Sequence, residues 1–256
     1  MPLSELADRL RTGRSVRGLV CVTFDDGYVD NLETAAPILT RFGVPATFFI
    51  VTGMMGRPFW WDRLTGLVDG LAEIPAAGRL RLDGLHWTFE IADLSRQTRA
   101  DLLTGLYALL KSRSDEVRDR SLDELARQAG IDAPVASRSM TWDELGQLLS
   151  NDLFAAGGHS LTLPQLASLD EPSQRAEIAD CRARLTDFVG RSVNHFAYPF
   201  GARQDVSQRT MEIAREAGIE IACGTELDVV RHSSDPLRLP RFWVSDWSAE
   251  RFASRV

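Results

Sequence analysis

The stretch Val20–Asn31, VCVTFDDGYVDN, decides the fold, because in it an apolar run ends abruptly in two acids and a glycine. Residues Leu19–Phe24 are predicted to form a buried strand, with Asp25 and Asp26 at its tip. Two neighbouring carboxylates in a medium of low dielectric repel each other, so their pKa values tend to separate. One of them can then bind a cation while the other takes a proton. The pair also fits a strand-ending turn in which Asp26 caps the next helix.

Outward from this stretch, short apolar runs alternate with helical patterns, which is typical of parallel βα units. A helix is expected over Asn31–Phe42, and Pro37 indicates that its regular part starts only near Ala36. The other predicted strands and helices are Ala46–Val51, Phe154–Gly158, a long helix from Pro172, Asn194–Tyr198, Asp205–Ala217 and Glu220–Cys223. This order in a chain of 256 residues favours an α/β barrel.

Residues 60–138 interrupt the alternation. They are expected to hold two or three helices and a hairpin that pairs Leu80–Leu82 with His86–Ile91 across the turn Asp83–Gly84. We interpret this segment as an insertion in a single domain that spans residues 1–256, rather than as a separate domain. After it, Thr141 and Glu144 have the spacing of a capping box that opens the next helix.

The composition indicates which kinds of partner the protein binds and in which cellular compartment it is found. The net charge of −7 makes nucleic acid an unfavoured partner. The three cysteines, Cys21, Cys181 and Cys223, form no paired motif, which favours reduced thiols in a reducing compartment. The N-terminal stretch has no apolar signal core, and no apolar run is long enough to span a bilayer. We therefore expect a cytoplasmic protein without a transmembrane segment.

Three predicted strand tips carry residues suited to chemistry. They are Asp25-Asp26-Gly27, Gly158-His159-Ser160 and Tyr198-Pro199-Phe200-Gly201. In α/β barrels and open α/β sheets, active sites lie at the carboxyl ends of the strands. The fold is therefore expected to bring these distant segments to one rim.

Several motifs together resemble the polysaccharide deacetylase (NodB-like) family, carbohydrate esterase family four. They are TFDDGYVDN, VPATFFIVTG, PFWWDRL at Pro58–Leu64, TWDEL at Thr141–Leu145, GGHSLTLPQL at Gly157–Leu166 and FAYPFG at Phe196–Gly201. The likeness runs in family order from Leu19 to about Trp243. The motif PFWWDRL and the insertion after it look like a bacterial subgroup tied to surface-glycan synthesis.

The resemblance implies a distorted (β/α) barrel of about seven strands that hydrolyses N-acetyl groups on amino sugars with the help of a divalent metal. By this analogy, Asp25 is the general base, and Asp26 and His159 are metal ligands. Carboxylate oxygen and imidazole nitrogen suit zinc, with cobalt or nickel as alternatives. The Tyr198-Pro199-Phe200 motif is expected to contact substrate, and the backbone N–H of Phe200 to stabilise the oxyanion.

The chain departs from the family pattern at three places. Leu163 stands where the family has its second metal histidine, and leucine cannot coordinate a metal. Ala197 stands where the family has an arginine that steadies the base. The late histidine that serves the family as general acid has no counterpart in the tail LRLPRFWVSDW. We considered Glu226 as a substitute ligand or base and His232 as a substitute acid.

Alternatives therefore stay open. Trp61 fits either stacking on a sugar ring or packing in the core. The chain is interpreted as a metal-dependent deacetylase, as a catalytically degenerate homologue that binds a glycan or a partner enzyme, or as a variant hydrolase without the full metal triad. The sequence gives no prediction of oligomeric state or of the particular sugar.

Overall fold

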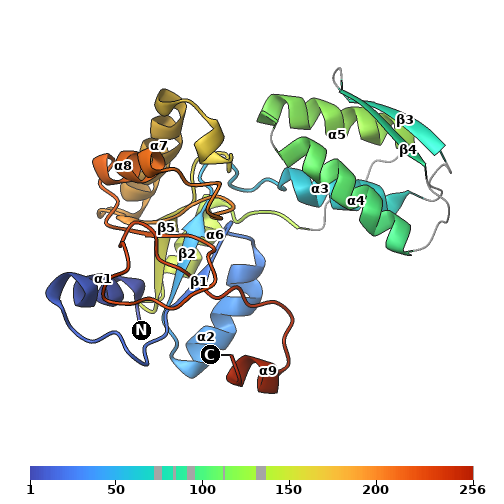
Figure 1. Cartoon of the computed structure of the whole chain (residues 1–256). Coiled ribbons are helices and arrows are strands. Elements are labelled where there is room, and N and C mark those ends of the chain that lie inside the picture. Colours follow the sequence, from blue (N-terminus) through green and yellow to red (C-terminus); the bar gives the residue numbers. More distant parts are fainter. Residues whose placement is uncertain (72–76, 83–84, 91–95, 112, 131–136, 256) are drawn as a thin grey trace. The chain divides into compact units, whose positions relative to one another are not determined.

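The computed structural model describes residues 1–71, 77–82, 85–90, 96–111, 113–130 and 137–255. These residues form two compact units, each described by itself below (Figure 1). The first unit consists of Met1–Gly27, Glu33–Gly53 and Gln147–Val256, and the second of Tyr28–Leu32 and Met54–Gly146. The second unit contains the predicted insertion at residues 60–138, and the single-domain organisation stays a prediction.

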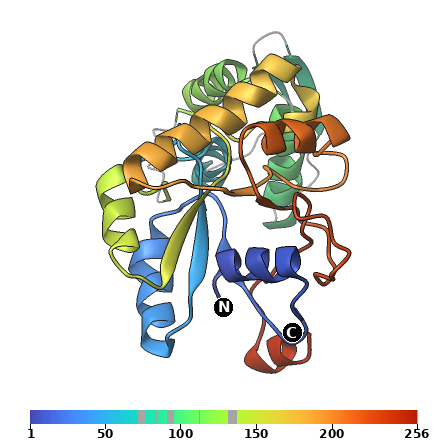
Figure 2. The ribbon, with the colours of Figure 1, turned by 90° about the vertical axis from the view of Figure 1, so that its left-hand side faces the viewer.

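The first unit is built on a parallel sheet with the strand order β1-β2-β5-β6-β7. These strands are β1 (Val22–Phe24), β2 (Ala46–Ile50), β5 (Phe154–Gly158), β6 (His195–Ala197) and β7 (Ile221–Cys223). The sheet curls into a half-barrel with helices around it, which confirms the predicted fold class (Figures 1 and 2). Within the described ranges it has five strands, fewer than the seven or so expected.

Strand β1 differs from its prediction. It begins at Val22, and Leu19 and Val20 before it are 38% and 50% exposed. The strand itself is half-buried, because it lies at the edge of the sheet and pairs on one side with β2. A run of apolar residues indicates a strand but does not reveal whether that strand is central or at an edge.

Helices surround the sheet. They are α1 (Leu3–Thr12), α2 (Ala36–Phe42), α7 (Glu171–Val189), α8 (Gln208–Glu216), the short α9 (Ala249–Ala253) and a 3₁₀ turn at Leu166–Ser168. Helix α6 (Trp142–Leu149) begins in the second unit and ends in the first. Regular helix α2 starts at Ala36, as Pro37 predicts, and a wider π-helical turn at Asn31–Ala35 precedes it. The predicted capping box is confirmed, since Thr141 N–H donates to Glu144 and Glu144 N–H donates to the Thr141 hydroxyl. None of the helices in the described part is long and apolar enough to cross a membrane.

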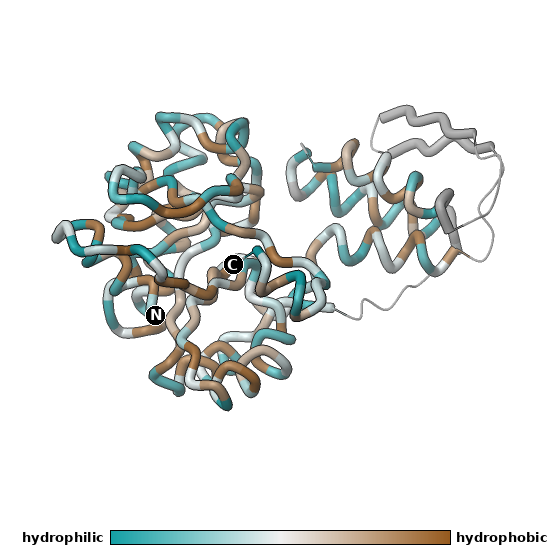
Figure 3. Tube along the Cα trace, turned by 60° about the horizontal axis from the view of Figure 1, so that its bottom comes forward, coloured by the Kyte–Doolittle hydropathy of each residue, from teal (hydrophilic) through white to brown (hydrophobic). Residues whose placement is uncertain are grey.

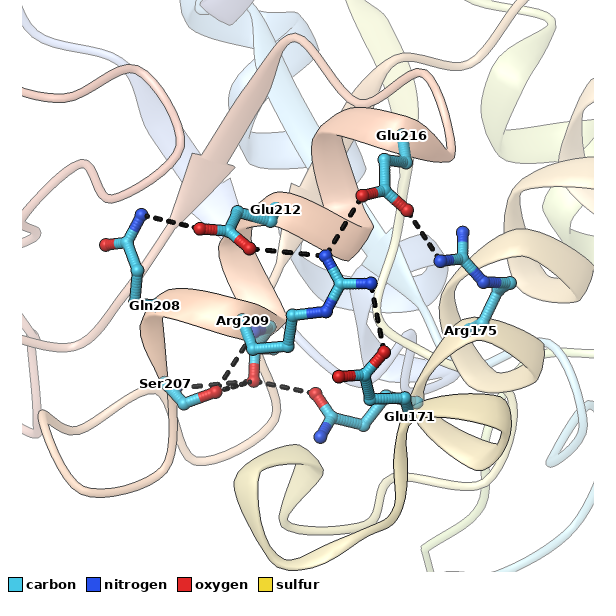
Figure 4. Close-up of polar contacts among 9 residues, drawn as sticks. Glu171, Arg175, Ser207, Gln208, Arg209, Glu212 and Glu216 are labelled. Carbon is cyan, nitrogen blue, oxygen red and sulfur yellow. Dashed lines mark hydrogen bonds and ion pairs between the residues drawn. The ribbon is translucent and has the colours of Figure 1, made fainter.

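Helices α7 and α8 lie side by side (Figure 2). Figure 4 shows the ion pairs that join them: Arg209 of α8 contacts Glu171 of α7, and Glu216 of α8 contacts Arg175 of α7. Arg209 also contacts Glu212 and Glu216 on its own helix. Because the partners are half-exposed, solvent screens each pair, and the network acts mainly to fix the register of the two helices.

The second unit has its own core. Its elements are α3 (Trp60–Gly70), the antiparallel hairpin of β3 (Ala77–Leu82) and β4 (Leu85–Glu90), α4 (Arg96–Lys111) and α5 (Asp115–Ala129). The core residues are Trp60, Leu64, Leu67, Val68, Leu102, Leu106, Leu110, Leu122 and Leu125. Hydrophobic and hydrophilic residues alternate along these helices, as an amphipathic packing requires (Figure 3). The predicted hairpin is confirmed by the pairing of Arg81 with His86. The predicted turn Asp83–Gly84 and the strand end at Ile91 lie outside the described residues.

One charged side chain is enclosed in this unit. Arg118 of α5 is 2% exposed. Its Nε donates to the Leu110 carbonyl at 3.1 Å and its Nη2 to the Lys111 carbonyl at 2.7 Å. These carbonyls belong to the last turn of α4, which has no intrahelical donors for them. The guanidinium also lies 5.2 Å from the ring centre of Trp60.

Replacement of Arg118 by methionine should therefore destabilise the second unit. Methionine fills much of the volume but removes the two guanidinium hydrogen bonds to the Leu110 and Lys111 carbonyls, of which the Leu110 carbonyl keeps the Arg113 N–H; we expect this to lower the free energy of unfolding by about 1–3 kcal/mol. Urea unfolding followed by tryptophan fluorescence measures the loss. The matched control is R113M, at an exposed arginine between α4 and α5, which should leave the midpoint unchanged. An R118M midpoint equal to that of the wild type would contradict this role.

Candidate active site

Strained backbone marks the three strand tips. Among the described residues, the non-glycine positions with positive φ are Asp26 (69°), Ser160 (65°), Leu163 (63°) and Phe200 (60°). Each follows β1, β5 or β6. Such conformations cost about 1–3 kcal/mol each and persist where the surrounding structure enforces them, often at functional sites. The strand tips that were predicted to carry the functional residues are therefore also the places where the backbone is strained.

Asp25 is held by an arginine that sequence reasoning missed. The guanidinium of Arg241 donates from Nη1 and Nη2 to the two carboxylate oxygens of Asp25, both at 2.7 Å. Such a two-pronged contact fixes the plane of the carboxylate as well as its charge. Arg241 itself is anchored, since its Nε donates to the Gly224 carbonyl at 2.8 Å and its Nη1 to the Thr23 hydroxyl at 3.2 Å.

The contact with Arg241 helps to outweigh the effect of burial on the pKa of Asp25. Burial is the largest single influence and raises the pKa of the carboxyl group. The charge of Arg241, the charge of His159 and the hydrogen bonds from Arg241 together lower the pKa below its usual value. Asp25 is therefore an ionised carboxylate over the physiological pH range.

Asp26 and His159 face each other. The imidazole of His159 is buried, with its Nε2 3.4 Å from Oδ1 of Asp26. Its Nδ1 lies 2.7 Å from the Ala197 carbonyl oxygen, which can only accept, so Nδ1 carries the proton. In neutral imidazole the lone pair of Nε2 then points at an anionic oxygen. A proton or a cation between the two atoms satisfies this arrangement, and metal-binding histidines commonly have their other nitrogen bonded in this way.

The pKa of His159 is raised by its acidic neighbours. Burial is the largest influence and lowers the pKa. The hydrogen bond with Asp26 and the charges of Asp25 and Asp26 outweigh it, so the imidazole prefers a bound proton or a positive partner.

These donors fit a divalent ion as a site with two protein ligands. Leu163 is 4% exposed and has no donor atom in its side chain. The described ranges contain no group of three or more histidine, cysteine, aspartate or glutamate side chains arranged to hold a metal. Any further coordination positions would belong to water or substrate.

The third tip is a tight turn closed by Thr225. The Thr225 hydroxyl donates to the Phe200 carbonyl at 2.8 Å, and the Thr225 N–H donates to the Gly201 carbonyl at 2.9 Å. A Cβ on Gly201 would lie 3.0 Å from the Thr225 backbone. The side chains of Tyr198 and Pro199, predicted to contact substrate, are instead buried, and burial raises the pKa of Tyr198. These two residues hold the turn that carries Phe200.

The remaining candidates each have surroundings of their own. Glu226 forms an ion pair with Arg238 at 3.0 Å, and His232 is exposed beside the end of α1, at Gly13. Trp61 belongs to the second unit. There its ring stacks on Phe59 with centres 4.6 Å apart, which matches the packing alternative for this residue.

Comparison with known proteins identifies the class. The model of the polysaccharide deacetylase family matches residues 13–100 and 117–222. The chain therefore belongs to the polysaccharide deacetylase family, a class of hydrolases that act on amide bonds and generally use a divalent metal.

Individual relatives are distant. The deacetylase PplD of Streptococcus pyogenes, solved with acetate, superposes with a TM-score of 0.61 at 15% identity, over 100% of this chain and 78% of that one. IcaB of Ammonifex degensii gives a TM-score of 0.60 at 18% identity, over 99% and 80%. Over 38 residues the chain is 46% identical to the putative polysaccharide deacetylase YxkH of Bacillus subtilis (strain 168). These residues are 15% of this chain and 14% of that protein. At these identities the solved structures establish the fold.

Proposed function

We propose that the chain removes the N-acetyl group from an amino sugar in bacterial surface-glycan metabolism, with a divalent metal held by Asp26 and His159. The observation that carries the proposal is the side-by-side placement of two differently arranged acids. Asp25 is fixed by Arg241 as an ionised carboxylate, while Asp26 faces the lone pair of His159. This is the division of labour that metal-assisted amide hydrolysis needs.

Each group has a defined task. The metal, with zinc favoured over cobalt and nickel, would supply Lewis acidity toward the acyl carbonyl. Asp25 takes a proton from water as the water oxygen attacks the carbonyl carbon, and then returns that proton to the leaving nitrogen. Acetic acid and a free amine result, and the acid then loses its proton to give acetate. The low pKa keeps Asp25 ionised but makes it a weaker base, so its fixed orientation matters more than its basicity.

The left-handed turn at Phe200 has the second task. We propose that its backbone N–H supports the oxyanion that forms on the acyl oxygen, because a preorganised donor costs no reorganisation during the reaction. Tyr198 contributes indirectly through the buried packing that holds this turn.

A second candidate function is glycan binding without turnover. It is favoured by Leu163, whose side chain cannot coordinate a metal as a histidine at that position would, so much of the expected metal affinity is lost. A partner enzyme would then be the other class of ligand for such a degenerate homologue. The cytoplasmic location stays a sequence-based proposal that rests on the three unpaired thiols.

Metal removal separates the two candidates. Treatment with a chelator is expected to reduce acetate release from N-acetylglucosamine oligosaccharides to background, and added Zn²⁺ or Co²⁺ should restore it. The H159A variant, dialysed and reloaded identically, should not recover, because it lacks the nitrogen donor. Full activity in protein freed of metal would exclude metal dependence. Retained glycan binding with no acetate release under any metal would instead favour the degenerate homologue.

A further inference from the structure

The loop after His159 is held in an unfavourable conformation. Within the four residues from Ser160 to Leu163, both end positions adopt left-handed backbone angles. Strain of this kind relaxes unless other contacts oppose it. Because Ser160 directly follows His159, relaxation of the loop would disturb the position of the imidazole.

One side of the loop is fastened to the end of β2. The Thr52 N–H donates to the Ser160 carbonyl at 3.2 Å, and the Gly53 N–H donates to the Leu161 carbonyl at 2.7 Å. A Cβ on Gly53 would stand 2.4 Å from that same carbonyl oxygen, so only glycine allows the approach.

The other side is fastened by Glu177 of α7. Its Oε2 accepts the N–H groups of Leu161 at 2.8 Å and Thr162 at 2.9 Å. Its Oε1 accepts the Thr162 hydroxyl at 2.7 Å. One half-buried carboxylate thus satisfies three donors of the loop, and hydrogen bonds to an ionised acceptor are about twice as strong as neutral ones.

We propose that Glu177 is a positioning residue that keeps the Ser160–Leu163 loop strained and thereby keeps His159 aligned with Asp26. The expected effect on metal affinity rests on the proposed function. The expected effect on the Ser160–Leu163 loop does not depend on that function.

The test compares E177A and E177Q with D180A. Asp180 is an exposed acid on the same helix and serves as the matched control. The rate of amide hydrogen exchange at Leu161 and Thr162 measures how firmly the loop is held. Titration with Co²⁺ measures the metal affinity, which depends on the position of His159. The titration is done in the wild type and in an L163H background, where histidine at the family's ligand position is expected to raise the affinity.

Loss of Glu177 is expected to act on both readouts. In E177A, exchange at Leu161 and Thr162 should accelerate at least about tenfold. Co²⁺ affinity should fall about 10- to 100-fold in the L163H background, the effect typical of losing a residue that orients a metal ligand. E177Q, whose amide oxygen still accepts, should fall between E177A and the wild type, and it keeps the test valid if E177A does not fold.

Two results would overturn the proposal: unchanged exchange in E177A and E177Q, or Co²⁺ affinities within twofold of the parent for both. An effect of D180A equal to that of E177A would overturn it as well. Failure of the proposed function is distinct, because D26N and H159A would then leave Co²⁺ binding unaffected while the exchange result at the loop stood.

Discussion

Replacement of Asp25 by asparagine is expected to lower the rate of acetate release by about 10²- to 10⁴-fold, the range over which a positioned general base contributes. The amide cannot take a proton from water at any accessible pH. Its oxygen still accepts one of the two hydrogen bonds from Arg241, whereas its NH₂ group cannot accept the other, so one contact of the pair remains. The loss should therefore appear in kcat, with little change in KM.

The control for this variant is D30N, which makes the same chemical change at an exposed aspartate five positions further along the chain. Its activity and thermal midpoint should match those of the wild type. Initial rates of acetate release, with far-UV circular dichroism of each variant, provide the comparison. Activity of D25N within threefold of the wild type, in folded protein, would remove Asp25 from the reaction.

Replacement of Arg241 by alanine is expected to have the second-largest effect, up to about 10²-fold in rate, because a catalytic group freed from its partner loses its orientation. It should also change the pH dependence. Without the guanidinium, burial dominates and the pKa of Asp25 rises. The acidic limb of the pH–rate profile, below which the base is protonated, should then move to higher pH.

The R241K variant separates charge from geometry. Lysine keeps the positive charge but not the planar fork of donors. The acidic limb of R241K should therefore stay close to that of the wild type while kcat falls. A profile of R241A with its acidic limb in the wild-type position would show that Arg241 does not set the pKa of Asp25.

The ion pair between Asp25 and Arg241 also makes the stability of the fold depend on pH. Since the pKa of Asp25 is lower in the folded protein than in the unfolded chain, its stabilisation is complete above the unfolded pKa of about 3.9. It is lost as the pH falls through the lowered folded value. R241A should weaken this acid dependence.

Local sequence patterns predicted much of the fold. The run before Asp25 locates β1, Pro37 locates the start of α2, and the spacing of Thr141 and Glu144 locates the capping box. Each of these features depends on residues a few positions apart. The edge position of β1 and the burial of Tyr198 depend on distant packing, and the sequence pattern did not reveal them.

The same contrast between local patterns and distant contacts explains why only part of the site was predicted. Asp25, Asp26 and His159 lie at strand ends, where topology alone brings them together. Arg241 was missed because it reaches Asp25 from 216 positions away in the chain. The bridge between Leu239 and Cys223 returns the chain to the end of β7 two residues before Arg241, and this contact is visible in the structure, not in the sequence. The resemblance predicts an arginine at the position of Ala197, whereas in this structure Arg241 binds Asp25.

Anomalous X-ray scattering from crystals soaked with Zn²⁺ and acetate, measured at the zinc edge, tests the central claim most directly. We expect one strong peak about 2.0–2.2 Å from an oxygen of Asp26 and from Nε2 of His159, with Asp25 still paired to Arg241. A map without a peak between Asp26 and His159 at millimolar Zn²⁺, or a peak elsewhere only, would contradict it.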